Sequence, residues 1–136
     1  MPALSPQEFV SRDYSSDLSA ADLLRAYRLM ALSRKLDERC WILHRQGKIA
    51  FHISGIGQEA CQLAAGLALQ PGKDYYFPHY RDMVTVLALG MTPVEILMGT
   101  YGKAGDPGSG GRQMPNHYNY RPANIVSVSS PVTTQV

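Results

Sequence analysis

The chain carries little charge, and this scarcity excludes some classes of protein. Aspartate, glutamate, lysine and arginine make up 18% of its 136 residues, and the formal net charge is +2. That excess is too small to favour a nucleic acid or an anionic membrane as a partner. No basic run with interleaved aromatic residues occurs either. We therefore expect no nucleic-acid binding, and the low charge suggests a surface partly covered by other protein.

Cysteines and long apolar runs are also scarce. The two cysteines, Cys40 and Cys61, stand in apolar, helix-like surroundings, which predicts small buried side chains in a reducing compartment. No apolar run reaches the roughly 18 residues that a membrane-spanning helix needs. The segment 1–17 is polar and contains Pro2 and Pro6, which is not typical of a signal peptide. These features predict a cytoplasmic protein without a membrane segment.

Hydrophobic spacing and capping residues predict a largely helical chain. Residues 1–18 are expected to form a flexible arm, and Ser19 with Asp22 resembles a capping box that starts a helix over 20–46. An apolar stripe at helical spacing predicts the buried face of this helix. The stripe consists of Leu23, Leu24, Tyr27, Met30, Leu32, Leu36, Cys40 and Leu43.

Three shorter helices are expected over 58–69, 80–89 and 93–101. The first is rich in alanine and glycine, which allows another backbone to approach closely. Thr92 and Glu95, with proline between them, form a strong start signal for the last.

The segment 78–82, Pro-His-Tyr-Arg-Asp, joins an extended stretch to the third predicted helix. A tyrosine hydroxyl and an arginine guanidinium beside a helix N-terminus suit an anion such as a phosphate, because all of these groups donate hydrogen bonds. Tyr80 and Arg81 are therefore candidate anion-binding residues. The structural alternative is a surface pair of Arg81 with Asp82, with Tyr80 in the core.

The segment 55–60 has the pattern G-x-G-x-x-A of a dinucleotide-binding turn. Its context is poor for that fold, because a long helix precedes it and no clear second strand with a terminal acid follows. Glu59 either caps the following helix or points into a cleft.

A long loop over 102–122 contains a mixed polar stretch at 110–118. Its charged donor, thioether and imidazole suit a pocket for a small acid with an apolar tail, and a solvated loop is the alternative. The four histidines lack metal-ligand spacing, and Cys40 and Cys61 are too far apart to help, so we predict no zinc site. No Ser-His-Asp pattern is present. A β-like run over 124–128 then leads into a hydroxyl-rich turn at 129–135.

Four stretches in this order resemble the alpha subunit of the thiamine-diphosphate-dependent 2-oxo acid dehydrogenases, the decarboxylating component of those complexes. They are Gly57-Gln58-Glu59-Ala60, Phe77-Pro78-His79-Tyr80-Arg81-Asp82, Gly111-Arg112-Gln113-Met114-Pro115 with His117, and Ser129-Ser130-Pro131-Val132-Thr133-Thr134-Gln135. The resemblance covers the chain from about residue 23 onward. The Arg-Gln-Met-Pro-x-His run is similar to the branched-chain type, whereas pyruvate and acetoin members tend to carry Gly-Gly-Ser-Met-His there.

The resemblance implies roles for particular residues. Tyr80 and Arg81 would contact the cofactor's diphosphate, and Ser130 and Val132 would embrace its aminopyrimidine ring. The residues that match the substrate pocket are Phe51, Tyr80, Met114 and His117. Branched-chain members also bind potassium through positions that match Ser129, Pro131, Thr134 and Gln135.

The resemblance also implies a fold class, and it implies that some functional residues lie outside this chain. The fold class would be α/β, with this chain forming the N-terminal part of a thiamine-diphosphate-binding fold: mostly helical, with a first parallel strand near its C-terminal end. Residues 19–136 would be the N-terminal portion of that domain, truncated at 136. The magnesium ligands and a catalytic histidine would lie beyond Val136, so no catalytic residue is expected within the chain, and the chain alone is expected to be inactive.

The function implied is oxidative decarboxylation of a branched-chain 2-oxo acid, with transfer of the acyl group to a lipoyl group. The implied partners are a beta subunit of the same component, in a two-alpha, two-beta assembly, and a lipoyl-bearing acyltransferase core. Two alternatives stay open. One is a pyruvate or acetoin dehydrogenase alpha subunit, and the other is a truncated, non-catalytic interaction module.

Overall fold

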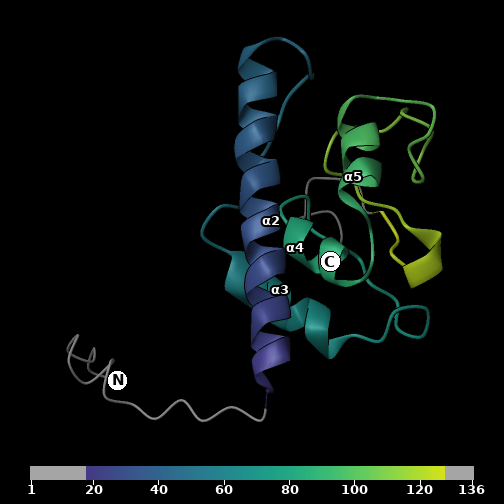
Figure 1. Cartoon of the computed structure of the whole chain (residues 1–136). Helices are drawn as coiled ribbons and strands as arrows, with labels where there is room; N and C mark the ends of the chain where they lie inside the picture. The colour runs from purple at the N-terminus through teal and green to yellow at the C-terminus, as the bar shows by residue number, and fades with distance from the viewer. Residues whose placement is uncertain (1–17, 128–136) are drawn as a thin grey trace, which may run out of the picture.

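The computed structural model describes residues 18–127, and this part of the chain is helical with long connecting loops (Figure 1). Its elements are α2 (Ala20–Arg45), α3 (Glu59–Ala68), α4 (Met83–Ala88), α5 (Pro93–Thr100) and the short 3-10 helix η1 (Arg121–Ala123). In these residues no helix is both long enough and apolar enough to cross a membrane. The predicted arm over 1–18, apart from Leu18, and the predicted turn over 129–135 lie outside the described residues.

Helix α2 begins at the predicted capping box. The Ser19 hydroxyl accepts the Asp22 backbone N–H at 3.2 Å, and the Asp22 carboxylate accepts the Ser19 backbone N–H at 3.1 Å. The helix ends near Gly47, whose φ of +68° is a left-handed conformation that glycine adopts without steric cost. The predicted boundaries of this helix are therefore confirmed to within one residue.

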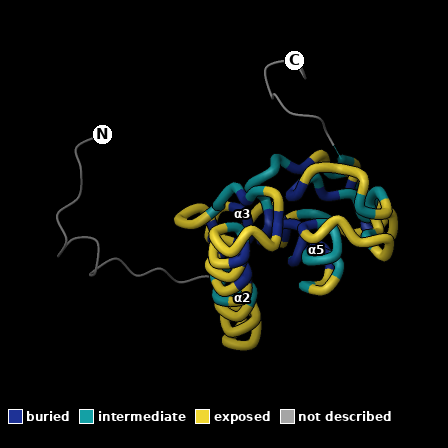
Figure 2. The backbone as a smooth tube through the Cα atoms, turned by 90° about the horizontal axis from the view of Figure 1, so that it is seen from above, coloured by how far each residue is buried: buried dark blue, intermediate teal, exposed yellow. Residues whose placement is uncertain are grey.

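The apolar stripe of α2 is buried only in its second half, among the described residues. Leu36, Cys40 and Leu43 are buried, whereas Leu23 is 50% exposed and Tyr27 is 66% exposed. The expectation of a continuous buried face was wrong for the first turns, because no other described element covers them. Figure 2 shows exposed residues along much of α2 and buried segments gathered where the helices and loops meet.

Helix α4 forms the centre of the core. All residues from Met83 to Leu87 are buried, and α4 packs against both α2 and α3. The contact with α3 is close: a Cβ added at Gly66 would lie 2.7 Å from the Ala88 Cβ. This confirms that the small residues of α3 permit close helix packing. By contrast, Cys61, which was expected to be buried, is exposed on the outer side of α3.

The third helix starts later than predicted, at Met83 rather than Tyr80. The preceding residues 79–82 form a turn, in which the Asp82 backbone N–H donates to the His79 carbonyl at 3.0 Å. The Asp82 carboxylate accepts the His79 backbone N–H at 2.8 Å and the Tyr76 hydroxyl at 2.7 Å. These bonds stabilise the turn in preference to a helical conformation of the same residues. Tyr80 and Arg81 consequently lie before the helix, not within it.

Extended structure is limited to isolated bridges in residues 18–127. Ile125 pairs with Tyr76 in a parallel bridge and with Tyr120 in an antiparallel one. Ile125 is 1% exposed and belongs to the main hydrophobic cluster, so the predicted β-like run does enter the core. A regular parallel strand over 124–128 is not formed in the part that the structure describes.

Candidate functional site

A short irregular segment, residues 51–55, connects the stretches that the sequence singled out. The Asn116 side chain, from the long loop, donates to the Ile53 carbonyl at 3.0 Å. The Arg81 guanidinium, from the turn before α4, donates to the Ser54 carbonyl. The Asp37 carboxylate of α2 accepts the Gly55 backbone N–H at 2.8 Å. Through these contacts α2, the 79–82 turn and the loop around Asn116 are held to one segment, which also carries Phe51.

The Tyr80–Arg81 pair lies half-buried at this junction. The Arg81 carbonyl accepts the Gln62 side-chain amide at 2.9 Å, which fixes the backbone of the turn to α3. The Arg81 guanidinium carbon lies 5.6 Å from the Tyr80 ring centroid, within range of a cation–π contact. The Tyr80 ring in turn lies 3.8 Å from the His79 ring, centroid to centroid. Three contacts thus fix Arg81: one to its backbone carbonyl, one to its guanidinium group, and the cation–π contact with the Tyr80 ring.

The alternative arrangement of this turn, a surface pair of Arg81 with Asp82, is not what the structure shows. The Asp82 carboxylate is occupied by Tyr76 and by the His79 backbone N–H. Burial raises the pKa of Tyr76, and its hydrogen bond to Asp82 raises that pKa further. Since Nη1 donates to the Ser54 carbonyl, and Nε and Nη2 have no protein acceptor among the described residues, Arg81 retains donors for a ligand.

The helix end contributes less to anion binding than the sequence predicted. Helix α4 is only six residues long, and Asp82 stands at its N-cap position with a negative charge. The dipole of so short a helix is small, and the carboxylate opposes a second anion there. Binding of an anion at this turn would therefore depend on the side chains of Tyr80 and Arg81.

Asp37 and His52 form a buried polar pair beside this turn. Asp37 is 3% exposed and His52 is 5% exposed, and the His52 Nε2 lies 3.0 Å from the Asp37 Oδ1. Burial raises the pKa of Asp37, but hydrogen bonds from His52 and the Gly55 N–H outweigh it, so the pKa lies below its ordinary value. With Asp37 ionised, Nε2 carries the proton that it donates. The Trp41 ring packs edge-on against His52 at 5.8 Å.

Glu59 lies in the first turn of α3 and lines a pocket with Tyr27, Met30 and Arg34, which agrees with the second of its two expected roles, because the N-cap position of α3 has no side-chain hydrogen bond. Its carboxylate accepts the Gly57 backbone N–H at 2.8 Å and the Arg34 Nε–H at 2.6 Å. The bond from Arg34 is the main cause that lowers the pKa of Glu59. Segment 51–55 before it forms no strand, so the context of a dinucleotide-binding turn is missing from these described residues.

The loop that carries Met114 and His117 is ordered by a second carboxylate. Asp106 accepts the backbone N–H of Gly108 at 3.1 Å, of Ser109 at 3.0 Å and of Gly111 at 3.1 Å. Burial raises the pKa of Asp106. The three backbone hydrogen bonds and a fourth from the Ser109 hydroxyl outweigh burial, so the pKa lies below its ordinary value. The loop is therefore ordered around Asp106, while Arg112, Gln113 and Met114 are exposed, so the alternative of a solvated loop stays open.

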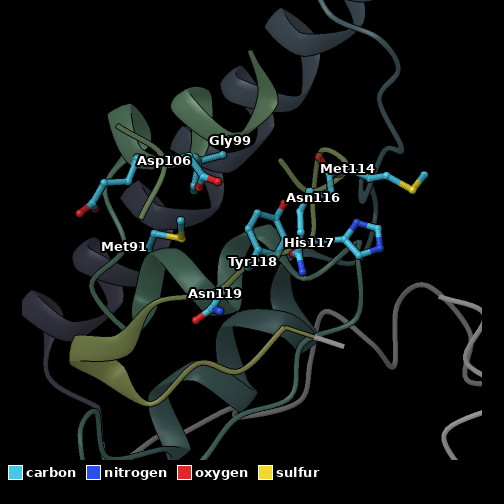
Figure 3. Close-up of a pocket in the computed structure, with 11 residues that line it drawn as sticks. Met91, Gly99, Asp106, Met114, Asn116, His117, Tyr118 and Asn119 are labelled. Carbon is cyan, nitrogen blue, oxygen red and sulfur yellow. The ribbon is translucent and has the colours of Figure 1, made fainter. Parts of the chain in front are cut away.

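Figure 3 shows the small pocket that this loop lines together with α5. The Met114 and His117 side chains lie on one side of Tyr118, and Asp106 and Met91 lie on the other. Met114 is 59% exposed, and the His117 Nδ1 lies 3.1 Å from the Pro115 carbonyl. Two of the four predicted substrate-pocket residues thus share a loop, and the Asn116 side chain ties that loop to the segment of Phe51.

Several residues that were expected to belong to the functional site lie outside the described residues. These are Ser129, Ser130, Pro131, Val132, Thr134 and Gln135. Within residues 18–127 no group of three or more histidine, cysteine, aspartate or glutamate residues is arranged to hold a metal ion.

Sequence reasoning missed the residues that brace the site. Asp37, Ser54, Gln62 and Asn116 each make a buried or half-buried contact that joins distant segments. Asn116 stood within a stretch already singled out, and Asp37 stood among charged residues on a helix. The position of Asp37 beside Leu36 and three residues before Cys40, both of which are buried, is the signal that could have indicated burial of Asp37.

The chain belongs to the dehydrogenase E1 component family, which matches residues 27–136. It is 54% identical to the alpha subunit of 2-oxoisovalerate dehydrogenase from Bacillus subtilis over 121 residues, which cover 89% of this chain and 36% of that protein. It is 36% identical over 113 residues to a mitochondrial alpha subunit of the same name from Arabidopsis thaliana, covering 83% of this chain and 24% of the relative. The mouse mitochondrial subunit is 35% identical over 120 residues, with coverages of 88% and 26%.

These matches confirm the resemblance to alpha subunits of 2-oxo acid dehydrogenases of the branched-chain type. The chain spans about a third or less of the length of the curated relatives that it matches.

Proposed function

We propose that this chain is part of the alpha subunit of a branched-chain 2-oxo acid dehydrogenase, and that its Tyr80–Arg81 turn holds the diphosphate of thiamine diphosphate. The observation that carries the proposal is the fixed position of Arg81, which keeps guanidinium donors available beside the Tyr80 ring. The family match and the names of the relatives favour this reading over a pyruvate or acetoin enzyme and over a non-catalytic module.

The residues present fit a diphosphate group at this turn. A guanidinium donates charge-assisted hydrogen bonds to phosphate oxygens, and a phenolic hydroxyl adds a neutral one. The nearest carboxylate, Asp82, is already occupied by Tyr76 and by the backbone of His79, so its remaining capacity to compete for Arg81 is small. Tyr80 and Arg81 would therefore bind and orient the cofactor, while Gln62 and Ser54 keep the turn in place.

The proposed substrate site uses Phe51, Tyr80, Met114 and His117. Its support is indirect: Phe51 lies in the segment to which both Arg81 and Asn116 donate hydrogen bonds. An exposed thioether and an aromatic ring suit a branched aliphatic chain, and the imidazole of His117 suits a carboxylate. When bound, the cofactor supplies the carbon nucleophile and electron sink that decarboxylation of a 2-oxo acid requires. The residues of this chain would orient the acid toward it.

The remaining parts of the proposal concern residues and partners beyond those described. Ser130 and Val132 would contact the aminopyrimidine ring, and a potassium ion would bind at Ser129, Pro131, Thr134 and Gln135. Magnesium would be held by ligands outside this chain. The partners would be a beta subunit and a lipoyl-bearing acyltransferase core, and the location would be the cytoplasm.

The proposed fold is the N-terminal part of an α/β domain that binds thiamine diphosphate, formed by residues 19–136. The parallel bridge between Tyr76 and Ile125 supports a first parallel strand near 124–128, because strands of such a sheet run in the same direction. Residues 1–18 would be an arm outside this domain.

A titration of thiamine diphosphate with magnesium into the complete, assembled protein tests the proposed cofactor site. We expect Arg81→Ala to raise the dissociation constant at least about tenfold, which corresponds to about 1.4 kcal/mol. Arg39→Ala, an exposed arginine on α2, is the matched control and should leave the constant unchanged. An unchanged dissociation constant for Arg81→Ala would contradict the assignment.

Substrate profiling of the same assembled enzyme tests the acid that it uses. The proposal predicts a higher kcat/KM for the 2-oxo acids of the valine, leucine and isoleucine skeletons than for pyruvate. A preference for pyruvate or acetoin would replace the branched-chain assignment with the first alternative and leave the cofactor site in place.

A further inference from the structure

We propose that Asp37 is a positioning residue for Arg81 and acts on it through the segment 52–55. The inference rests on the proposed function of Arg81 as a diphosphate ligand. Asp37 belongs to α2 and has no place among the residues that the resemblance assigns to cofactor or substrate. Its role follows from three contacts that form a continuous path.

The first contact fixes the segment to α2. The Asp37 carboxylate accepts the His52 Nε2–H at 3.0 Å with one oxygen and the Gly55 backbone N–H at 2.8 Å with the other. The two bonds bracket the segment, with one at each of its ends. Because the carboxylate is 3% exposed, water cannot replace either bond without opening the core.

The second contact passes from the segment to the guanidinium. Ser54 lies between the two residues that Asp37 holds, and its carbonyl accepts the Arg81 Nη1–H. A carbonyl that is fixed in direction selects one rotamer of the arginine side chain. The remaining guanidinium donors are then presented with little loss of side-chain entropy on binding.

The third contact limits how far the two segments can move. A Cβ added at Gly55 would lie 2.6 Å from the Arg81 carbonyl oxygen, so the backbones touch with no space between them. Gln62 donates to the same carbonyl at 2.9 Å, and its amide nitrogen would lie 3.3 Å from the added Cβ. A shift of segment 52–55 would therefore displace the turn of Arg81 as well as remove the acceptor of its guanidinium.

A buried carboxylate is well suited to this task, because it accepts two hydrogen bonds in a charge-assisted form. Neutral asparagine can keep one acceptor for Gly55 and can donate to His52 if the histidine changes tautomer. Alanine can do neither. The geometry therefore predicts a large effect for Asp37→Ala and a smaller one for Asp37→Asn.

A double-mutant cycle in the complete, assembled protein tests the inference, with the dissociation constant of thiamine diphosphate and magnesium as the readout. We expect Asp37→Ala to raise the constant at least about fivefold, and to change it less than about twofold when Arg81→Ala is already present. Asp37→Asn should recover most of the lost affinity. Glu38→Ala, the neighbouring and exposed carboxylate that pairs only with Lys35 among described residues, is the control and should have no effect.

The outcomes separate the two claims. If Arg81→Ala alone leaves the constant unchanged, the proposed function and this inference are both overturned. If Arg81→Ala weakens binding but Asp37→Ala has the same effect in both backgrounds, or no effect, only the inference is overturned. Should Asp37→Ala fail to assemble, Asp37→Asn takes its place in the cycle, and its smaller effect on the constant should likewise disappear when Arg81→Ala is present; an effect of the same size in both backgrounds would overturn the inference.

Discussion

The side chain of Asn116 donates a hydrogen bond of 3.0 Å to the backbone carbonyl of Ile53, although 63 positions separate the two residues in the chain. Asn116 adopts a left-handed backbone conformation, with a φ of +67°, to reach this position. Asparagine tolerates this conformation better than most residues. The bond joins the loop of Met114 and His117 to the segment that holds Arg81, and so gathers the proposed site from distant parts of the sequence.

Gly66→Ala should destabilise the protein, although alanine is the better helix former. The added Cβ would lie 2.7 Å from the Ala88 Cβ and 3.2 Å from the Thr85 carbonyl oxygen, so α3 and α4 must separate. Overpacking of this kind costs about 1–3 kcal/mol. Thermal or chemical unfolding of the complete protein measures the loss. Cys61→Ala, on the exposed side of the same helix, is the control and should change stability by less than about 0.5 kcal/mol. Equal stability of the two variants would show that the helices do not pack this closely.

Asp106→Asn should lower stability at neutral pH and have little effect in acid. The folded-state pKa of Asp106 lies below its ordinary value of 3.8, because hydrogen bonds from Ser109 and three backbone N–H groups outweigh the effect of burial. The carboxylate therefore contributes stability above its ordinary pKa, and this contribution is lost as the pH falls through the folded value. We expect a difference of about 1–2 kcal/mol from the parent protein near pH 7.

Unfolding curves recorded from about pH 7 to about pH 3 check this prediction. Other carboxylates titrate equally in both proteins, so the difference between the two curves isolates Asp106. The difference should shrink as the pH falls below 3.8, the ordinary pKa of the carboxyl group. A constant difference across the range would mean that the ionised carboxylate is not what orders the loop.

Tyr118→Phe should leave the protein as stable as before or raise its melting temperature. The Tyr118 hydroxyl is buried and has no hydrogen-bond partner among the described residues, and burial raises its pKa. Removing an unsatisfied buried polar group relieves a desolvation cost. Tyr76→Phe is the matched comparison, because it removes a hydroxyl that donates to Asp82 at 2.7 Å, and it should cost about 1–2 kcal/mol. If Tyr118→Phe is the more damaging of the two, an ordered water must satisfy its hydroxyl.

Local signals in the sequence predicted the helices well. The capping boxes at Ser19 and Thr92 were read from residues three positions apart, and both are formed. Such contacts depend only on neighbouring residues, so a sequence pattern contains all that they require. The predicted start of α4 was wrong. The Asp82 carboxylate accepts hydrogen bonds from Tyr76 and from the backbone of His79, and these contacts compete with a helix that begins at Tyr80.

The sequence indicated candidate ligands of the proposed site but not the residues that support them. Tyr80 and Arg81 were singled out from their chemistry, whereas Asp37, Gln62 and Asn116 act on residues 18, 19 and 63 positions away. No spacing rule connects such partners, because tertiary packing and not the local sequence brings them together. The exposure of Leu23 and Tyr27 escaped prediction for a related reason: periodicity shows which side is apolar, not how far along the helix other elements cover it.

The most direct test is a crystal structure of the complete, assembled protein with thiamine diphosphate and magnesium bound. The account predicts diphosphate oxygens within hydrogen-bond distance of the Arg81 guanidinium and the Tyr80 hydroxyl, with the Ser54 carbonyl still bound to Arg81. A diphosphate bound elsewhere, with Arg81 pointing away from it, would contradict the account.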